Sequence, residues 1–326
     1  MRSKLLVVLT SIALAGSTAS AQAPLPTAGS ATAAPAVATP GYAAHRVYDT
    51  KKKRFIDFET MSAQLAKADI VFLGEQHDDP RTHQLQAATL DAIARRRSGP
   101  ITLALEMFER DVQPHVDAYL AGTMSEADFL AKSRPWPNYG TDYRPLVEFA
   151  KANGWPVVAG NVPRRYASGV ARRGLASVDS LPAAERGFVA KDLSCPRDGY
   201  WERFKATMGD MSGHGMQLSP EQLDQMVWRT YEAQCVKDET MGEAVAAAHT
   251  ARQALVIHAN GSFHSDYRYG TAERVKRRLP KAKIAVVSFV PVTDLDTVDG
   301  KPRRKLGDYV VFTLATPKPA AAAAAR

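Results

Sequence analysis

The sequence lacks any long apolar run after its first 21 residues, so we expect no transmembrane helix in the rest of the chain. It also lacks an internal repeat, and cysteine is scarce, with two residues among 326. The formal charge is +8, but the basic residues are scattered and not gathered in one run. This distribution argues against nucleic acid as a partner.

The N-terminus has the three parts of a secretory signal peptide. Two basic residues precede an apolar segment at residues 5–15, and residues 19–21 read Ala-Ser-Ala, a typical cleavage site. The residues around Ser17 resemble a lipoprotein box, except that serine stands where the acylated cysteine would be. We therefore predict cleavage near Ala21 and a periplasmic or secreted mature protein that is not lipidated.

Composition divides the chain into four parts. Residues 1–21 are the predicted signal peptide, and residues 22–42 form an Ala/Pro-rich segment that we expect to be a flexible linker. Residues 317–326 are again mostly Ala and Pro and are predicted to be a disordered tail. The part between them, residues 43–316, has the length of one large domain.

Short apolar runs alternate with helical segments in this domain. After a hairpin of residues 46–49 and 54–58, we expect strands at residues 70–73, 101–105, 156–160, 254–258, 283–290 and 309–314. The main helices between them are expected at residues 80–97, 143–153 and 271–279. This alternation is typical of βαβ units, so we predict an α/β fold with a mostly parallel β-sheet flanked by helices.

The region from about residue 164 to 250 breaks the alternation and is predicted to be a helical insertion or subdomain. It carries Cys195 and Cys235. Because export would place them in an oxidising compartment, we expect them to be paired. Such a bridge would staple the insertion and not the functional site.

Polar residues follow the predicted strands at several points. Two Gly-x-x-His motifs end in His77 and His264, Glu106 follows the second strand, and Asn161 follows the third. Ligands of open parallel sheets bind beyond the carboxyl ends of the strands, so we expect these side chains to converge. His258, at the end of an apolar strand, is expected to be a core residue, and His83 is expected to be an exposed helix residue.

The predicted cluster contains Glu75, His77, Glu106 and His264. This set suits a divalent metal ion such as zinc, manganese or cobalt. It equally suits a metal-free acid–base pair in which a carboxylate orients a histidine base. A buried polar network that pins the loops is the structural alternative.

Three further features could contact a ligand. A phenol in the aromatic loop at residues 136–145 could bind a ferric haem iron, or the loop could simply pack over the sheet edge. Arg164 could neutralise a carboxylate or propionate, or be a plain cation at a helix start. Met211 and His214, in a Gly-rich stretch, could bind a soft metal or haem iron, or belong to a gating loop.

Six motifs, in order along the chain, resemble those of the ChaN-like haem-binding uptake proteins of the Tiki superfamily. They are residues 72–78 (FLGEQHD), 105–110 (LEMFER), 142–146 (DYRPL), 161–164 (NVPR), 231–241 (YEAQC and KDETM) and 261–264 (GSFH). The resemblance extends over about residues 44–291. It implies an α/β fold with a helical subdomain and haem binding at the cell envelope. In some members a tyrosine binds the iron and haem lies between two protomers, which places Tyr143 as the ligand and suggests a homodimer around it.

The same superfamily includes hydrolases that use the Gly-x-x-His histidines and the glutamate after the second strand. By this resemblance His77, His264 and Glu106 would be catalytic, with Glu75 beside them. Two hypotheses follow. The chain is an exported haem-binding protein for haem or iron uptake, working with envelope components, or it is a metal- or histidine-dependent hydrolase of ester or peptide bonds.

Overall fold

The computed structural model describes residues 43–209 and 219–315, which belong to one compact unit. The predicted signal peptide, linker and tail lie outside the described residues, and so do Met211 and His214. No helix among the described residues is long and apolar enough to cross a membrane.

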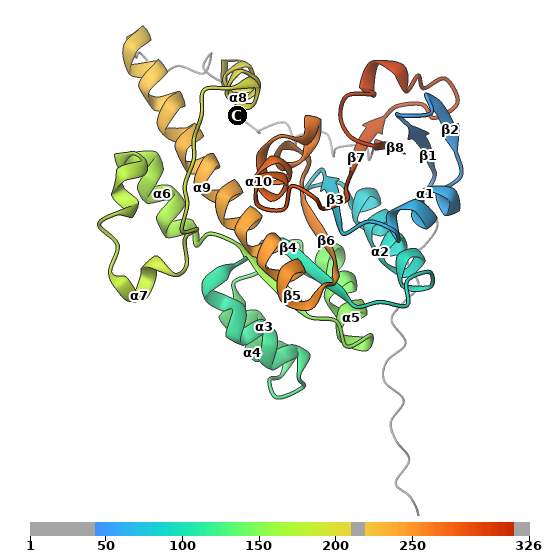
Figure 1. The fold of residues 1–326 in the computed structure, drawn as a ribbon, viewed down its shortest axis with the longest axis horizontal. Coiled ribbons are helices and arrows are strands. Elements are labelled where there is room, and N and C mark those ends of the chain that lie inside the picture. Colours follow the sequence, from blue (N-terminus) through green and yellow to red (C-terminus); the bar gives the residue numbers. More distant parts are fainter. Residues whose placement is uncertain (1–42, 210–218, 316–326) are drawn as a thin grey trace, which may run out of the picture. The chain divides into compact units, whose positions relative to one another are not determined.

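In the described part of the chain, eight strands form one sheet in the order β2-β1-β8-β7-β3-β6-β4-β5 (Figure 1). The strands are β1 (His45–Asp49), β2 (Arg54–Ile56), β3 (Ile70–Glu75), β4 (Ile101–Glu109), β5 (Val157–Asn161), β6 (Leu255–Gly261), β7 (Ile284–Val292) and β8 (Tyr309–Leu314). The six strands from β8 to β5 pair in parallel, whereas β1 pairs antiparallel with both β2 and β8. The predicted α/β fold, mostly parallel sheet and N-terminal hairpin are confirmed.

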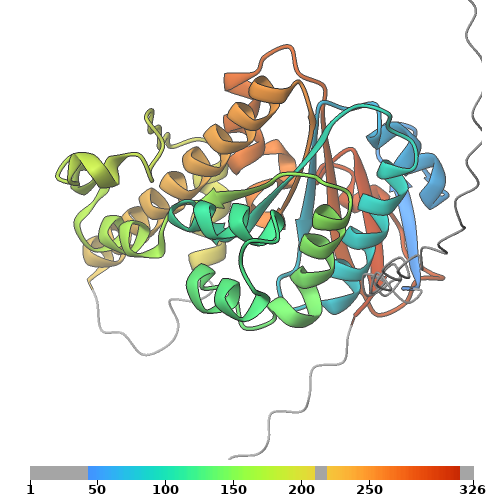
Figure 2. The same ribbon diagram turned by 90° about the horizontal axis from the view of Figure 1, so that it is seen from below.

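Helices cover both faces of the parallel strands (Figure 2). They are α1 (Phe58–Leu65), α2 (Pro80–Ala94), α3 (Gln113–Leu120), α4 (Glu126–Ser133), α5 (Arg144–Ala152), α6 (Arg164–Arg173), α7 (Ala183–Arg186), α8 (Gly199–Gly209), α9 (Pro220–Arg252) and α10 (Gly270–Arg278). On β3, Val71 and Leu73 pack with residues of α1 to α5, while Ile70 and Phe72 pack with α9 and α10. Side chains of a strand alternate between faces, so burial on both sides explains the unbroken apolar run.

Strand β4 is longer than expected. It was predicted to end just before Glu106, but it extends to Glu109, and its pairing with β5 shifts register between Leu105 and Glu109. Glu106 therefore lies inside an irregular strand end. Such an irregularity changes the direction of the side chains locally. The polar residues of this segment led to the prediction that the strand ends earlier.

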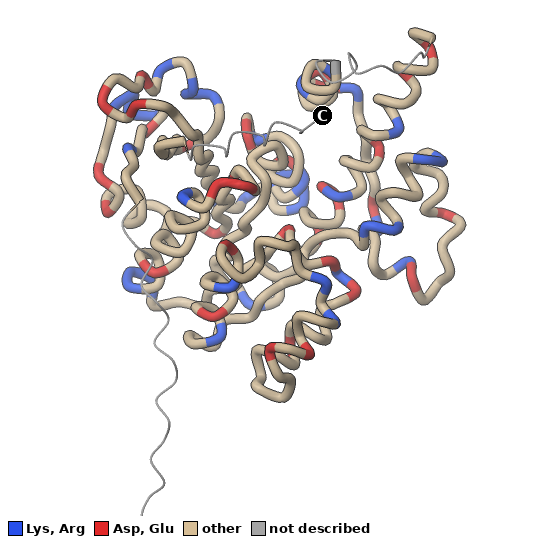
Figure 3. Tube along the Cα trace, turned by 180° about the vertical axis from the view of Figure 1, so that it is seen from behind, with Lys and Arg blue, Asp and Glu red and all other residues tan. Residues whose placement is uncertain are grey.

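The helical region after β5 is confirmed, but it is not separate from the sheet. It comprises α6 to α9, and α9 packs against β4, β5 and β6 as well as α10. Cys195 and Cys235 form a disulfide with their Cα atoms 5.5 Å apart. Lys and Arg residues are interspersed with Asp and Glu residues along the described parts of the trace (Figure 3), in line with the scattered charges of the sequence.

Candidate functional site

The site lies where three neighbouring strands end. Strand β6 lies between β3 and β4 in the sheet, although it follows them by more than a hundred residues in the chain. Glu75 is the last residue of β3, Glu106 belongs to the end of β4, and His264 closes the short 3-10 turn after β6. The order of strands reverses here, which is the usual position of ligand sites in open parallel sheets. The predicted convergence is therefore seen.

The first half of the site is a glutamate–histidine pair. His77 places Nδ1 2.8 Å from Oε1 of Glu75, and the Tyr143 hydroxyl donates to the same oxygen. Gln86 donates to the other oxygen at 2.6 Å. Glu75 is 2% exposed, whereas the His77 side chain is 45% exposed and meets the ring of Trp136 edge-on at 4.6 Å. A buried carboxylate thus orients a histidine that solvent can reach.

The second half is a histidine between two carboxylates. His264 directs Nε2 toward Oε1 of Glu106 at 3.3 Å and Nδ1 toward Oδ1 of Asp238 at 2.7 Å. The side-chain amide nitrogen of Gln234 also lies 3.1 Å from Nε2, but when both ring nitrogens are protonated these two groups are donors and form no hydrogen bond. All of these but Gln234 are nearly or fully buried. Asp238 comes from α9, so the helical insertion contributes directly to the site.

The two halves meet at Gly261. Its backbone N–H donates to Oε2 of Glu106 at 2.7 Å. A Cβ atom at this position would lie 2.6 Å from Nε2 of His77 and 3.6 Å from Oε2 of Glu106. Glycine is required here for close approach, since any side chain would displace the imidazole.

The charges of the cluster set its protonation. Burial disfavours the charged form of His264, but the charges of Glu106 and Asp238 outweigh it and raise the pKa of His264 to about 10. Burial acts against the charge of Glu106 too, yet His264 holds the pKa of Glu106 well below its ordinary value. The pKa of His77 is also raised, because its hydrogen bond to Glu75 and the charge of Glu106 outweigh burial. At neutral pH, His264 is therefore an imidazolium with both ring nitrogens protonated.

The four residues expected to bind a divalent metal do not fit one in this arrangement. A metal needs a nitrogen lone pair, and both nitrogens of His264 face carboxylates as donors. Both oxygens of Glu75 accept hydrogen bonds from neighbouring side chains. In the described part of the chain, no group of three or more His, Cys, Asp or Glu side chains is arranged to hold a metal ion.

Tyr143, the expected haem ligand, is buried and bound elsewhere. It is 1% exposed and its hydroxyl donates to Glu75. Burial and then the charge of Glu75 raise the pKa of the phenol well above its ordinary value. An iron ligand would need the phenolate, which this environment disfavours. In this conformation, Tyr143 supports the Glu75–His77 pair instead of presenting an oxygen to a ligand.

The remaining predicted contacts are not brought into the cluster. Arg164 is exposed at the start of α6, where its backbone N–H donates to Glu109 at 3.0 Å. Among the residues that the structure describes, the guanidinium of Arg164 forms no hydrogen bond with a residue of the cluster. Met211 and His214 lie outside the described residues, so their predicted contacts with a ligand stay predictions.

Sequence reasoning misjudged one histidine and was right about another. His83 was expected to be exposed, but it is 2% exposed and bonds Oε1 of Gln86 through Nδ1 at 3.0 Å. Helix α2 is covered along this side by the loop that carries Tyr143, whose ring centroid lies 4.7 Å from that of His83. His258 is fully buried, as expected for a core residue, and burial lowers its pKa to about 4.

Asp238, Gln86 and Tyr200 were missed as site residues. Asp238 lies within the KDETM motif, so its position in a shared motif was the one available signal. Nothing in the spacing shows that it faces His264, 26 residues further along the chain. Tyr200 donates to Oδ2 of Asp238 at 2.8 Å from a separate helix.

Comparison with known proteins gives a consistent assignment. The family model described as haem-binding uptake, Tiki superfamily, ChaN matches residues 61–275. Among solved structures, ChaN of Campylobacter jejuni with cofacially bound haem superimposes with a TM-score of 0.62 at 18% identity, covering 83% of this chain and 97% of that chain. This likeness shows the fold.

A second solved structure, a mutant of erythromycin esterase EreC in an open conformation, has a TM-score of 0.44 at 12% identity and covers 76% of each chain. It is too distant to support an argument about activity. No curated protein matches the chain.

Proposed function

Because the chain belongs to the haem-binding uptake family of ChaN in the Tiki superfamily, we propose that it is an exported haem-binding protein that serves haem or iron uptake at the cell envelope. The observation that carries this proposal is the family match over residues 61–275, which includes Glu75, His77, Glu106 and His264. The signal-like N-terminus supports export to the periplasm.

Two features of His77 support this proposal. The Nδ1 bond to Glu75 leaves Nε2 as the ring nitrogen with a free lone pair whenever His77 is neutral. The indole of Trp136, whose ring centroid lies 4.6 Å from that of His77, offers apolar surface beside it. When bound, haem would supply an iron that accepts a nitrogen or oxygen ligand. Because Nε2 lies beside Gly261 in this conformation, His77 would hold that iron after its half-exposed ring moves away from Gly261. Tyr143, which orients Glu75, remains the alternative ligand.

Hemin titration of the mature chain tests this proposal. We expect a shifted Soret band that saturates, and a weaker or altered band in His77→Ala. Tyr143→Phe should change the spectrum less than His77→Ala, because it removes a hydrogen bond to Glu75 and not the iron ligand. The reverse order would restore Tyr143 as the ligand. Absence of any Soret shift would contradict haem binding by this chain.

A homodimer around the ligand is part of the same proposal. The C. jejuni structure holds haem cofacially, and two ligands face to face suit two copies of a chain. Sedimentation of the mature protein with and without hemin should show a ligand-dependent dimer. A monomer at hemin saturation would contradict it. Capture of envelope proteins by the loaded and the free chain would then identify uptake components as partners.

The cluster also supports a second candidate, a histidine-dependent hydrolase. The favouring observation is the Glu75–His77 pair facing a buried imidazolium across Gly261. His77 would take a proton from water as the water oxygen bonds to an ester or peptide carbonyl carbon, and then return it to the leaving group. We expect His77→Ala to abolish turnover of an ester panel if this holds, and metal analysis of the untagged protein to find no bound divalent metal. Unchanged turnover in His77→Ala would exclude the cluster as the hydrolytic site.

A further inference from the structure

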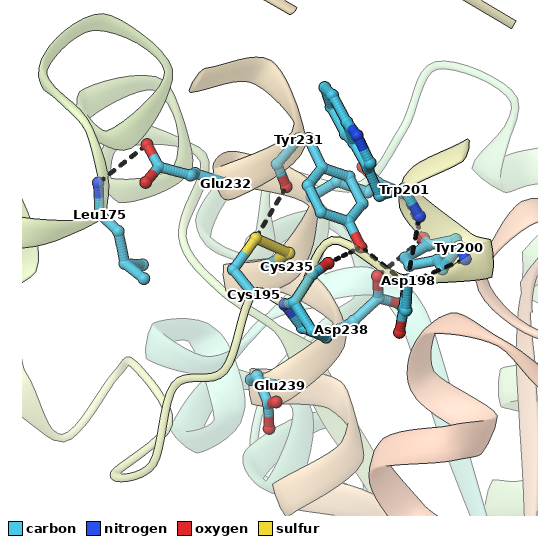
Figure 4. The surroundings of a disulfide bond; sticks show 12 residues. Leu175, Cys195, Asp198, Tyr200, Trp201, Tyr231, Glu232, Cys235, Asp238 and Glu239 are labelled. Carbon is cyan, nitrogen blue, oxygen red and sulfur yellow. Dashed lines mark hydrogen bonds between the residues drawn. A yellow bond between two sulfur atoms is a disulfide. The ribbon is translucent and has the colours of Figure 1, made fainter. Parts of the chain in front are cut away.

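A continuous set of bonds connects the disulfide to the histidine–carboxylate cluster. Cys235 lies three residues before Asp238 on α9, so both residues are on neighbouring turns of one helix. Cys195 lies in the segment that leads into α8, three residues before Asp198. Figure 4 shows the disulfide with Tyr200, Tyr231 and Asp238 around it. The bridge therefore ties the start of α8 to the part of α9 that serves the site.

The segment after Cys195 is held in place by several polar contacts. The Tyr231 hydroxyl donates to the Pro196 carbonyl at 3.1 Å. The Asp198 carboxylate accepts from the backbone N–H groups of Tyr200 at 2.9 Å and Trp201 at 3.2 Å. A carboxylate at the first turn of a helix satisfies free N–H groups and stabilises the helix start. These contacts fix the position from which the Tyr200 side chain leaves α8.

Tyr200 reaches from α8 to the site. It is fully buried, and its hydroxyl donates to Oδ2 of Asp238 at 2.8 Å (Figure 4). The guanidinium of Arg274, which is 1% exposed, lies 5.4 Å from the centre of the Tyr200 ring. The charge of Arg274 compensates that of Asp238 in the same buried region. Tyr200 thus fills the space beside a carboxylate that has no access to water.

Asp238 in turn fixes the position of His264. Its Oδ1 accepts from the Thr271 hydroxyl at 2.8 Å and bonds Nδ1 of His264 at 2.7 Å. Gly270 has φ +53°, and a Cβ there would lie 2.9 Å from Oδ1 of Asp238. Glycine at this position therefore lets the start of α10 approach the carboxylate closely. With one oxygen fixed by Tyr200 and the other by Thr271, Asp238 has one orientation, and the imidazole follows it.

We propose that Tyr200 and Asp238 are positioning residues for His264 and that the Cys195–Cys235 disulfide holds them in place, so that the oxidation state of this disulfide regulates the site. The proposal rests on the proposed function only for the ligand that the site binds. It corrects the expectation that the bridge staples an insertion remote from the chemistry. The site is then ordered in an oxidising compartment and loosened in a reducing one.

The redox step needs an external thiol. A dithiol reductant attacks one sulfur as its thiolate, forms a mixed disulfide, and closes to its own cyclic disulfide. Two electrons and two protons pass to Cys195 and Cys235, which become thiols. Cys195 is half-buried and Cys235 is 1% exposed, so attack at the Cys195 sulfur is the accessible route.

The proton on Nδ1 of His264 provides a direct readout. A ring N–H that is buried and bonded to a carboxylate gives a far-downfield, slowly exchanging proton signal, and Asp238→Asn assigns it. We expect the oxidised mature chain to show this signal. It should be lost or broadened after reduction, in the Cys195→Ser/Cys235→Ser double variant and in Tyr200→Phe, which keeps the disulfide and the ring. Tyr269→Phe is the matched control, since its ring lies 6.0 Å from that of Tyr200, and it should retain the signal.

Hemin titration of the same samples separates this proposal from the proposed function. We expect reduction and Tyr200→Phe to weaken hemin binding together by about tenfold, the effect of about 1.4 kcal/mol. A His264 signal that depends on the disulfide and on Tyr200 supports the proposal even if hemin does not bind. A signal unchanged in both the double variant and Tyr200→Phe overturns it, whatever hemin does. Loss in the double variant alone would overturn the role of Tyr200.

Discussion

The Tyr143 hydroxyl donates to the same oxygen of Glu75 that binds Nδ1 of His77. One carboxylate oxygen therefore joins a buried phenol to a half-exposed imidazole. Because Gln86 takes the other oxygen, Glu75 has its acceptors satisfied without water. This arrangement fixes the ring of His77 through Nδ1, and its other ring nitrogen, Nε2, lies beside Gly261.

Removal of the Tyr143 hydroxyl should destabilise the fold. Tyr143→Phe leaves a buried carboxylate short of one donor, and we expect the free energy of unfolding to fall by about 1–3 kcal/mol. Urea denaturation measures it. Tyr139→Phe is the matched control, because Tyr139 is also buried and its hydroxyl has no hydrogen-bond partner among the described residues. Equal losses in the two variants would contradict a specific role for the Tyr143 hydroxyl.

A side chain at residue 261 should disrupt the meeting of the two halves. In Gly261→Ala the new methyl group would lie 2.6 Å from Nε2 of His77, so the ring must move. We expect hemin affinity to fall by about tenfold, or about 1.4 kcal/mol. Gly160→Ala on β5 is the control, since its Cβ would meet Leu105 O at an ordinary 3.5 Å. If both variants bind hemin like the parent chain, His77 does not contact the ligand.

Stability should depend on alkaline pH through His264. Its pKa is raised from an ordinary 6.5 to about 10 in the folded chain, so its contribution is complete below about 6.5. The contribution is lost as the pH rises toward 10. We expect the free energy of unfolding to decline over this window in the parent chain and to decline less in His264→Asn. Parallel curves for the two chains would show that His264 is not held as an imidazolium.

Loss of the disulfide should cost stability as well as order at the site. The bridge spans 40 residues, and the loop-entropy relation gives about 4 kcal/mol for a loop of this size, with measured values often lower. The Cys195→Ser/Cys235→Ser double variant should therefore unfold at lower urea concentration. An unchanged urea midpoint in this variant would mean that the segment before α8 is held in place without the disulfide.

The N-terminus offers a test of export and anchoring. We expect the mature chain to begin at Gln22, as mass spectrometry of the periplasmic fraction would show. Ser17→Cys would complete the lipoprotein box, so this variant should move to the membrane and begin at residue 17 instead. Recovery of both proteins with residue 1 intact in the cytoplasm would contradict the predicted signal peptide.

The sequence predicted the strands well because they are buried on both faces. Residues 70–73 and 309–314 form strands within two residues of their expected limits. The end of β4 was missed because Glu106 and Glu109 look like loop residues, although Glu109 pairs with Asn161 of β5 and Glu106 lies in the irregular stretch before it. The local sequence pattern does not show which strand pairs with the end of β4.

For the site, the sequence predicted the residues that follow strands and missed those that come from helices. Glu75, His77, Glu106 and His264 share the position at a strand end, which a pattern can reveal. Asp238 lies in the middle of a helix of 33 residues, and the neighbouring sequence does not show that it is buried against a histidine. Buried partners such as His83 and Asp238 are set by which helix covers which strand, and that is a property of the whole chain.

The order of the strands also has a consequence for folding. Strand β6 lies between β3 and β4, so the two earlier strands cannot pair directly and must wait for residues 255–261. A chain that emerges from its N-terminus therefore leaves β3 without either of its partners, β6 and β7, and β4 without β6 until most of the domain has appeared. Long-range closure of this kind is slow and exposes apolar edges to wrong partners. We expect truncation before residue 255 to give an aggregating fragment, and chaperones to bind the chain while that gap is unfilled.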